Sequence, residues 1–114
     1  MVELVFVVIR FRVGLGEQAG FAERVRAAVE VLAKQKGFVS ARVGRNVDDP
    51  ELLALDLEWV NVGSYRRALS PYDVKMAAVP LLSEAIDEPT AYEDLLTQHG
   101  FDGGPPGPIA WSLP

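Results

Sequence analysis

The sequence contains no cysteine and only one histidine, His99, among its 114 residues. Without cysteine there is no disulfide, no thiolate nucleophile and no sulfur-bound zinc. A single histidine leaves little for a histidine-based metal site or a Ser-His triad. Most hydrolase and metalloenzyme classes are therefore excluded, and we expect neither a metal nor another cofactor.

Long hydrophobic runs and an excess of basic residues are also missing. The longest apolar run, Leu4–Ile9, is far too short to span a bilayer, and no signal-peptide pattern precedes it. The net charge of −5 argues against nucleic-acid binding, which requires a basic surface. We therefore expect a cytoplasmic protein with no membrane or nucleic-acid partner, whose partner is a small hydrophobic molecule or another protein chain.

Apolar residues make up 49% of the chain and charged residues 24%, which is typical of a folded globular domain. Residues 97–114 differ because glycine and proline recur there and exclude a long regular element. We therefore place one domain at residues 1–96 and a Gly/Pro-rich tail at 97–114. We expect the tail to lie extended on its own or a neighbouring subunit, and the alternative is a frayed terminus.

The first half of the chain predicts a strand, a helix and a hairpin. Residues 2–13 are rich in β-branched and aromatic side chains, which favours a central strand. Residues 17–36 carry one apolar stripe at the helical period, and Gly37 suits the position after the helix. Residues 38–46 and 52–60 form a hairpin about a turn at 47–51, and its centre sets Val39 opposite Trp59 and Arg42 opposite Asp56.

Two helical segments and a last strand follow. Asn61 is a typical N-cap for a short helix over 61–69, and Ser70-Pro71 predicts a restart with serine as N-cap and proline at the first helical position. Val79-Pro80 interrupts this helix at about residue 78, and helix resumes over 81–86. Residues 90–96 form the last strand.

This order of elements predicts an α+β, ferredoxin-like βαββαβ fold with an antiparallel sheet. Right-handed crossovers place the first and third strands at the centre and both helical regions on one face. The other face of the central strand carries Leu4, Phe6 and Val8, which favour burial. We therefore expect a homodimer in which two sheets pack face to face, as in a dimeric α/β barrel.

The segment LEWVNVGSYRRALSPYD, residues 57–73, brings a tryptophan at a strand end and a tyrosine on the next helix towards one cavity. Together with the order of elements, it resembles the antibiotic biosynthesis monooxygenase family over about residues 2–96. In members that oxidise polyketide anthrones to quinones without metal or flavin, Trp and Tyr at these positions line the cavity. The resemblance thus implies catalytic roles for Trp59 and Tyr65.

The same comparison identifies one departure from the family pattern, and the residues themselves suggest further binding candidates. Those members have an asparagine four residues before the tryptophan, where this chain has Leu55, so a hydrogen-bond donor to the substrate is missing. We include Leu55, Asn61 and Tyr72 as substrate-binding candidates, although Asn61 also has the simpler role of helix cap. Haem-degrading members have an asparagine on the first strand and an axial histidine, where this chain has Ile9 and residues 70–73, so haem degradation is disfavoured.

The functional hypothesis is a cofactor-independent monooxygenase acting on a small hydrophobic aromatic or quinol. The substrate carbanion would reduce dioxygen, while Tyr65 donates a hydrogen bond and the apolar pocket excludes water. One alternative is a non-catalytic ligand-binding or stress-associated dimer, which Leu55 favours. Another is an isomerase or a lactone-handling enzyme, which needs an acid or base in the cavity, whereas Asp56 and Glu58 are expected on the opposite face.

Overall fold

The structure, a computed structural model, describes residues 4–96. Its elements follow the predicted order, with the second helical region divided into three short helices. They are β1 (Val5–Arg12), a 3-10 helix η1 (Leu15–Glu17), α1 (Gln18–Ala33), β2 (Phe38–Arg45), β3 (Leu52–Trp59), α2 (Val62–Ala68), α3 (Tyr72–Ala77), α4 (Val79–Leu82) and β4 (Ala91–Glu93).

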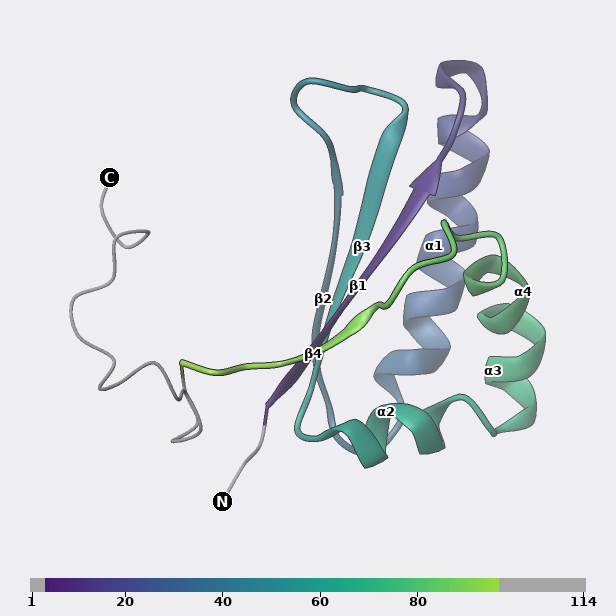
Figure 1. The fold of residues 1–114 in the computed structure, drawn as a ribbon. Coiled ribbons are helices and arrows are strands. Elements are labelled where there is room, and N and C mark those ends of the chain that lie inside the picture. The colour runs from purple at the N-terminus through teal and green to yellow at the C-terminus, as the bar shows by residue number, and fades with distance from the viewer. Residues whose placement is uncertain (1–3, 97–114) are drawn as a thin grey trace.

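The four strands form one antiparallel sheet in the order β2-β3-β1-β4, and the helices lie on one side of it (Figure 1). The first and third strands are central, as the crossover rule predicts. The α+β, ferredoxin-like fold expected from the sequence is therefore confirmed. Among residues 4–96, no helix combines the length and apolar character needed to cross a membrane.

The core lies between the sheet and the helices. Alternate residues of β1 and β3 point into it, because successive side chains of a strand face opposite sides. Helix α1 supplies the opposing layer through one stripe at the helical period. The buried residues of these three elements are Val5, Val7, Ile9, Phe11, Phe21, Val25, Ala28, Leu32, Leu53, Leu55, Leu57 and Trp59.

Gly37 connects α1 to β2 with a φ of +94°, a region that side chains with a Cβ rarely adopt. Its carbonyl accepts a hydrogen bond of 2.8 Å from the Val60 amide, so the chain after α1 is held against the end of β3. A Cβ at this position would lie 2.5 Å from the Ser64 Cβ. Glycine is therefore required here both by backbone geometry and by the approach of α2.

The hairpin register is confirmed over most of its length but not at its open end. Ala41 pairs with Leu57, and Arg42 pairs with Asp56 through an ion pair of 2.9 Å. A β-bulge between Phe38 and Ser40 then sets Phe38, not Val39, opposite Trp59. The expected Val39–Trp59 pairing is wrong because the bulge inserts one extra residue, and Val39 is 46% exposed.

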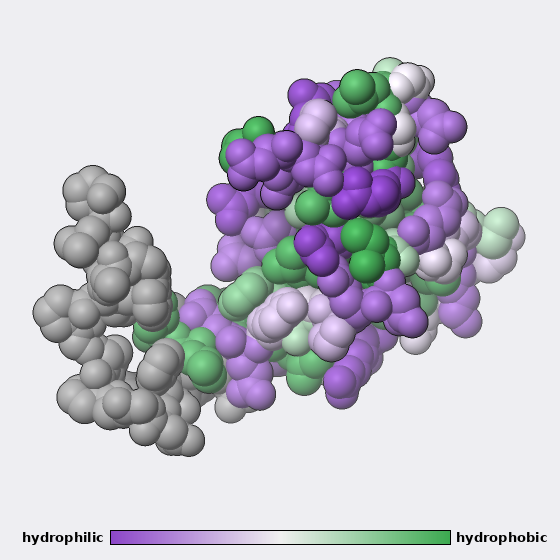
Figure 2. All heavy atoms as spheres, turned by 45° about the horizontal axis from the view of Figure 1, so that its top comes forward, coloured by the Kyte–Doolittle hydropathy of each residue, from purple (hydrophilic) through white to green (hydrophobic). Residues whose placement is uncertain are grey.

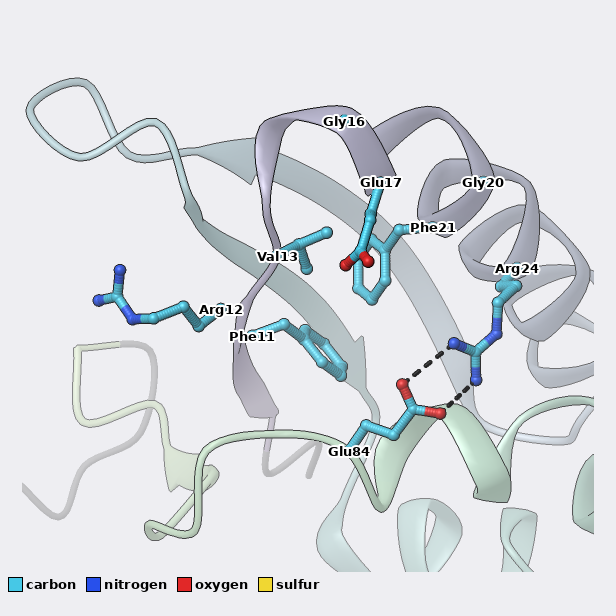
Figure 3. A pocket seen from close by; sticks show the side chains of 9 residues that line it. All are labelled: Phe11, Arg12, Val13, Gly16, Glu17, Gly20, Phe21, Arg24 and Glu84. Atoms are coloured by element: carbon cyan, nitrogen blue, oxygen red, sulfur yellow. Dashed lines mark hydrogen bonds and ion pairs between the residues drawn. The ribbon is translucent and has the colours of Figure 1, made fainter.

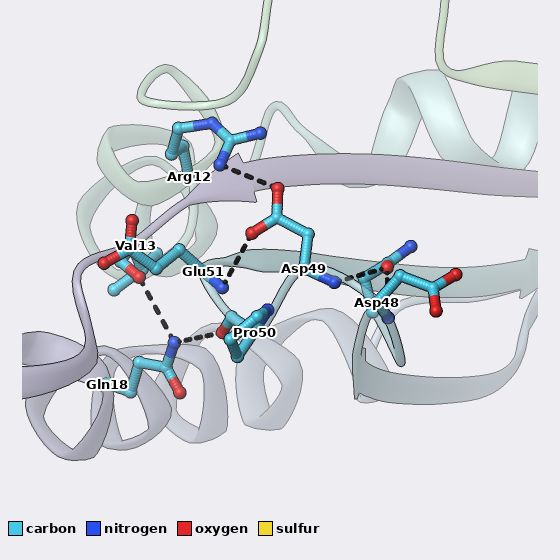
Figure 4. Close-up of polar contacts among 8 residues, drawn as sticks. Arg12, Val13, Gln18, Asp48, Asp49, Pro50 and Glu51 are labelled. Atoms are coloured by element: carbon cyan, nitrogen blue, oxygen red, sulfur yellow. Dashed lines mark hydrogen bonds and ion pairs between the residues drawn. The ribbon is translucent and has the colours of Figure 1, made fainter.

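Polar contacts attach the hairpin loop to the start of α1 (Figure 4). The Gln18 side-chain amide donates to the carbonyls of Val13 (3.2 Å) and Pro50 (2.7 Å). Arg12 donates to Asp49 at 3.0 Å, and this hydrogen bond lowers the pKa of the Asp49 carboxyl. These contacts fix the end of β1 relative to the loop.

Three sequence expectations for the helical region require correction. The N-cap of α3 is Pro71, not Ser70, and no side chain caps it. Helix α4 includes Pro80, because in the first turn of a helix the missing N–H has no partner to lose. Residues 83–86 are not helical, and the Ile86 amide instead donates to the Arg10 carbonyl at 2.8 Å.

The last strand is shorter than predicted, since β4 covers only Ala91–Glu93. On the face of the sheet opposite the helices, Phe6 stacks on Tyr92 with ring centroids 5.4 Å apart. No helix of residues 4–96 lies on this face (Figure 1). The predicted tail at 97–114 and His99 lie outside the described residues.

Candidate functional site

The end of β3 and the first turn of α2 place the two aromatic rings that the sequence singled out. Asn61 caps α2, as predicted, because its side-chain oxygen accepts a hydrogen bond of 2.8 Å from the Ser64 amide. The helix therefore starts directly after the strand and turns Tyr65 back towards Trp59. Their ring centroids are 5.8 Å apart and the ring planes are inclined by 48°.

The Trp59 indole is completely buried and is held from two sides. Phe38 packs edge-on against the indole with ring centroids 5.4 Å apart, and the Tyr65 ring makes the second aromatic contact. Within residues 4–96 the indole Nε1 has no hydrogen-bond partner. An unpaired buried N–H costs roughly 1–3 kcal/mol. The indole has no exposed surface and does not line the pocket beside Tyr65.

The Tyr65 ring borders a pocket of about 340 Å³ between β1, α4 and the connector to β4. Burial raises the pKa of the Tyr65 phenol, and a side-chain hydrogen bond with Thr90 offsets part of the rise. The phenol is consequently neutral at pH 7 and can donate a proton or a hydrogen bond. The lining residues are Ile9, Tyr65, Leu82, Ser83, Ala85, Ile86, Asp87, Glu88 and Thr90.

Two of the other sequence candidates lie apart from this pocket. Leu55 is 1% exposed and lines a separate groove of about 480 Å³ between α1 and the β2–β3 hairpin, where Val25, Val29 and Ala41 are also apolar. Tyr72 is 78% exposed at the start of α3. The structure thus brings together Trp59, Tyr65 and the cap residue that orients them, while Leu55 and Tyr72 are elsewhere.

The acidic residues of β3 point away from the aromatic pair. Glu58 accepts a hydrogen bond of 2.8 Å from Ser40, and Asp56 is paired with Arg42. Both carboxylates therefore belong to the face without helices, as the predicted register implies. Within the described 4–96 range, no three histidine, aspartate or glutamate side chains form a group that could hold a metal ion.

Sequence reasoning missed the connector between α4 and β4 as a wall of the pocket. Glu88 forms a two-point ion pair with Arg10 at 2.7 and 2.8 Å, which holds the connector over the central strand. Glu84 forms a second such pair with Arg24 at 3.0 and 2.6 Å. The opposite charges are visible in the sequence, but partners some 60 to 78 positions apart leave no local pattern.

The fold and the site define a small ferredoxin-like α+β protein with paired aromatic side chains at the end of its third strand. A family model described as antibiotic biosynthesis monooxygenase matches residues 4–75, more than half of the chain. The chain belongs to the antibiotic biosynthesis monooxygenase family. A search of curated proteins finds no match.

Solved structures show the same fold. A conserved protein from Methanosarcina mazei Go1 is 26% identical, with a TM-score of 0.65 over 80% of this chain and 92% of that one. SnoaB, a cofactor-independent oxygenase from Streptomyces nogalater, is 24% identical, with a TM-score of 0.62 over 81% of this chain and 87% of its own. A protein of unknown function from Bacteroides thetaiotaomicron, described as a possible oxidoreductase, is 10% identical, with a TM-score of 0.68 over 82% of this chain and all of that one.

Proposed function

We propose that this chain is a cofactor-independent monooxygenase that oxidises a small hydrophobic aromatic or quinol substrate beside Trp59 and Tyr65. The observation that carries the proposal is a neutral phenol in a partly buried pocket, in ring contact with an indole whose N–H has no partner within residues 4–96. Family membership and the description of SnoaB as a cofactor-independent oxygenase support it.

The chemistry divides between substrate and protein. An enolisable substrate loses a C–H proton to a water molecule, and the carbanion adds to dioxygen to form a C–O bond. The peroxide anion then takes a proton back from the water to give a hydroperoxide. The resulting hydroperoxide loses water and leaves a carbonyl, so one oxygen atom enters the product and the other leaves as water. Tyr65 donates a hydrogen bond to the substrate oxygen as negative charge develops there, and Ile9, Leu82 and Ile86 supply the apolar part of the pocket wall.

The test is oxygen uptake with a panel of anthrones and quinols, comparing the unaltered protein with Tyr65→Phe. The variant keeps the ring and loses the hydroxyl, so we expect a fall in kcat on the order of 100-fold, as for loss of a donor to a developing oxyanion. Tyr92→Phe is the matched control, because Tyr92 lies on the opposite face of the sheet. Equal rates in all three proteins would remove the assigned role of Tyr65.

A non-catalytic ligand-binding protein is the second candidate, and the side chain at position 55 favours it. Leu55 is buried and apolar where the anthrone-oxidising members have an amide donor, so the groove that it lines can bind but offers less to polarise a substrate. Saturable binding of a hydrophobic dye, with no oxygen uptake across the panel, would favour this function.

We also propose that the protein is a homodimer formed by the sheet faces that carry no helix. Phe6 and Val8 on β1 and Tyr92 on β4 are half-buried or exposed there, and their burial between two sheets would be favourable. The expected result is a dimeric mass by light scattering for the unaltered protein. Phe6→Glu should give a monomer, whereas a monomeric unaltered protein would contradict the proposal.

A further inference from the structure

A second pocket, of about 540 Å³, lies at the end of β1 beneath the first turns of α1 (Figure 3). It shares no lining residue with the pocket beside Tyr65. Its volume falls in the usual range for small-molecule sites, about 300–1,000 Å³. The lining residues are Phe11, Arg12, Val13, Gly16, Glu17, Gly20, Phe21, Arg24 and Glu84.

The floor of this pocket is aromatic. Phe11 and Phe21 are buried and meet edge to face with centroids 4.9 Å apart. In Figure 3 the Glu17 carboxylate overlaps the Phe21 ring in projection, and the Phe11 ring lies lower in the view. Phe11 is 2% and Phe21 is 8% exposed, so a ligand body can contact only the small part of each ring that reaches the pocket.

One wall has no side chains. Gly16 and Gly20 border the pocket, and a Cβ added at either would meet nothing within 4 Å. Gly20 lies inside α1, where glycine costs roughly 0.5–1 kcal/mol relative to alanine. No neighbouring atom requires that glycine, and a side chain in its place would stand in open space at the border of the pocket.

The charges of the lining leave one carboxylate unpaired. Arg24 and Glu84 neutralise each other through two contacts, drawn as dashed lines in Figure 3. Arg12 points away from the pocket and is paired with Asp49. Glu17, in contrast, is exposed, and among residues 4–96 its carboxylate has neither an ion-pair partner nor a capping hydrogen bond to α1. The lining therefore carries one unbalanced negative charge above an aromatic floor.

We infer that this pocket binds a small organic cation, an ammonium group on an aromatic or aliphatic body. The ammonium pairs with Glu17, and the body packs on the exposed parts of Phe11 and Phe21. Because the inference uses none of the groups proposed for oxygenation, it stands or falls separately from that function.

The experiment is a titration of the full-length protein with 2-phenylethylammonium chloride, followed by the NMR signals of the Gly16 and Gly20 amides. We expect saturable shifts centred on these two glycines. The neutral analogue 2-phenylethanol has nearly the same shape and should bind about tenfold more weakly, because it cannot pair with a carboxylate. No saturable shift with the ammonium ligand, or equal affinities for both ligands, would overturn the inference.

Two variants locate the site. Glu17→Gln should weaken binding of the ammonium ligand about tenfold and leave the alcohol unchanged. Its control is Glu23→Gln, because Glu23 lies on the same helix, is exposed and pairs with Arg26. Gly20→Leu adds a large side chain at the border of the pocket and should weaken binding of both ligands, while the better helix former keeps the fold. Unchanged binding in Glu17→Gln and Gly20→Leu would place the ligand elsewhere and refute the site.

Discussion

Trp59 and Tyr65 are in ring contact although one ends a strand and the other belongs to the next helix, with centroids 5.8 Å apart. Only the turn at Asn61 separates the two elements, and its side chain caps the helix. The position of the phenol therefore depends on a local backbone feature, and the position of the indole on the core.

Replacement of Trp59 tests how much of its burial is structural. Trp59→Ala should lower the free energy of unfolding by about 3–5 kcal/mol, since a fully buried indole leaves a large cavity. Trp59→Phe should cost clearly less, because the lost Nε1–H has no partner within residues 4–96. Urea unfolding measures both values. A loss in Trp59→Phe as large as that in Trp59→Ala would contradict this account of the indole.

The two ion pairs of the α4–β4 connector predict how stability depends on pH. Hydrogen bonds from Arg24 and Arg10 lower the pKa values of the Glu84 and Glu88 carboxyls. Stability from these pairs is therefore complete above the ordinary glutamate pKa of about 4.3 and is lost as the pH falls through the lowered values.

The double variant Glu84→Gln/Glu88→Gln should accordingly be less stable than the unaltered protein at pH 7 and equally stable in strong acid. Thermal unfolding across this pH range measures the difference. High salt should reduce the difference at pH 7, since both pairs are partly exposed. A difference that persists unchanged in acid would show that the glutamates stabilise the connector by packing.

The sequence predicted the parts of this fold that depend on local patterns. The stripe of α1, the alternation of β1 and β3, the Asn61 cap and the position of Gly37 all follow from periods and propensities of neighbouring residues. They were sufficient to predict the strand order, because the handedness of crossovers leaves few topologies.

The remaining features depend on contacts between distant residues. The bulge beside Phe38 replaces the register extrapolated from the loop, and the neighbouring Gly37 indicates the end of α1 rather than a bulge. The pocket beside Tyr65 forms because Arg10 and Glu88 hold the connector over the sheet. Sequence reasoning therefore named Trp59 and Tyr65 but missed the α4–β4 connector, because an ion pair between distant residues leaves no local pattern.

Gly37 offers a direct test of the junction between β2 and α2. Gly37→Ala should be strongly destabilising, because alanine at positive φ costs about 1–2 kcal/mol and its Cβ would also collide with the Ser64 side chain. Gly44→Ala is the control, since a Cβ there meets nothing within 4 Å. The double variant Gly37→Ala/Ser64→Gly should recover the part of the loss due to the collision. Full stability in Gly37→Ala would contradict the described backbone.

Ionisation of Tyr65 reports on its pocket without any substrate. Burial raises the phenol pKa above its ordinary value of about 10, so at alkaline pH the folded chain keeps a proton that the unfolded chain loses. The contribution of this group to stability is therefore complete below pH 10 and declines as the pH rises further.

Ultraviolet difference titration of the protein against Tyr65→Phe isolates this one phenol and should give a midpoint above 10. Thr90→Val removes the hydrogen bond that favours the charged form and should move the midpoint higher still. A midpoint at or below the ordinary value would mean that water reaches the phenol freely, and the pocket would then lack the dry environment that the proposed oxygenation requires.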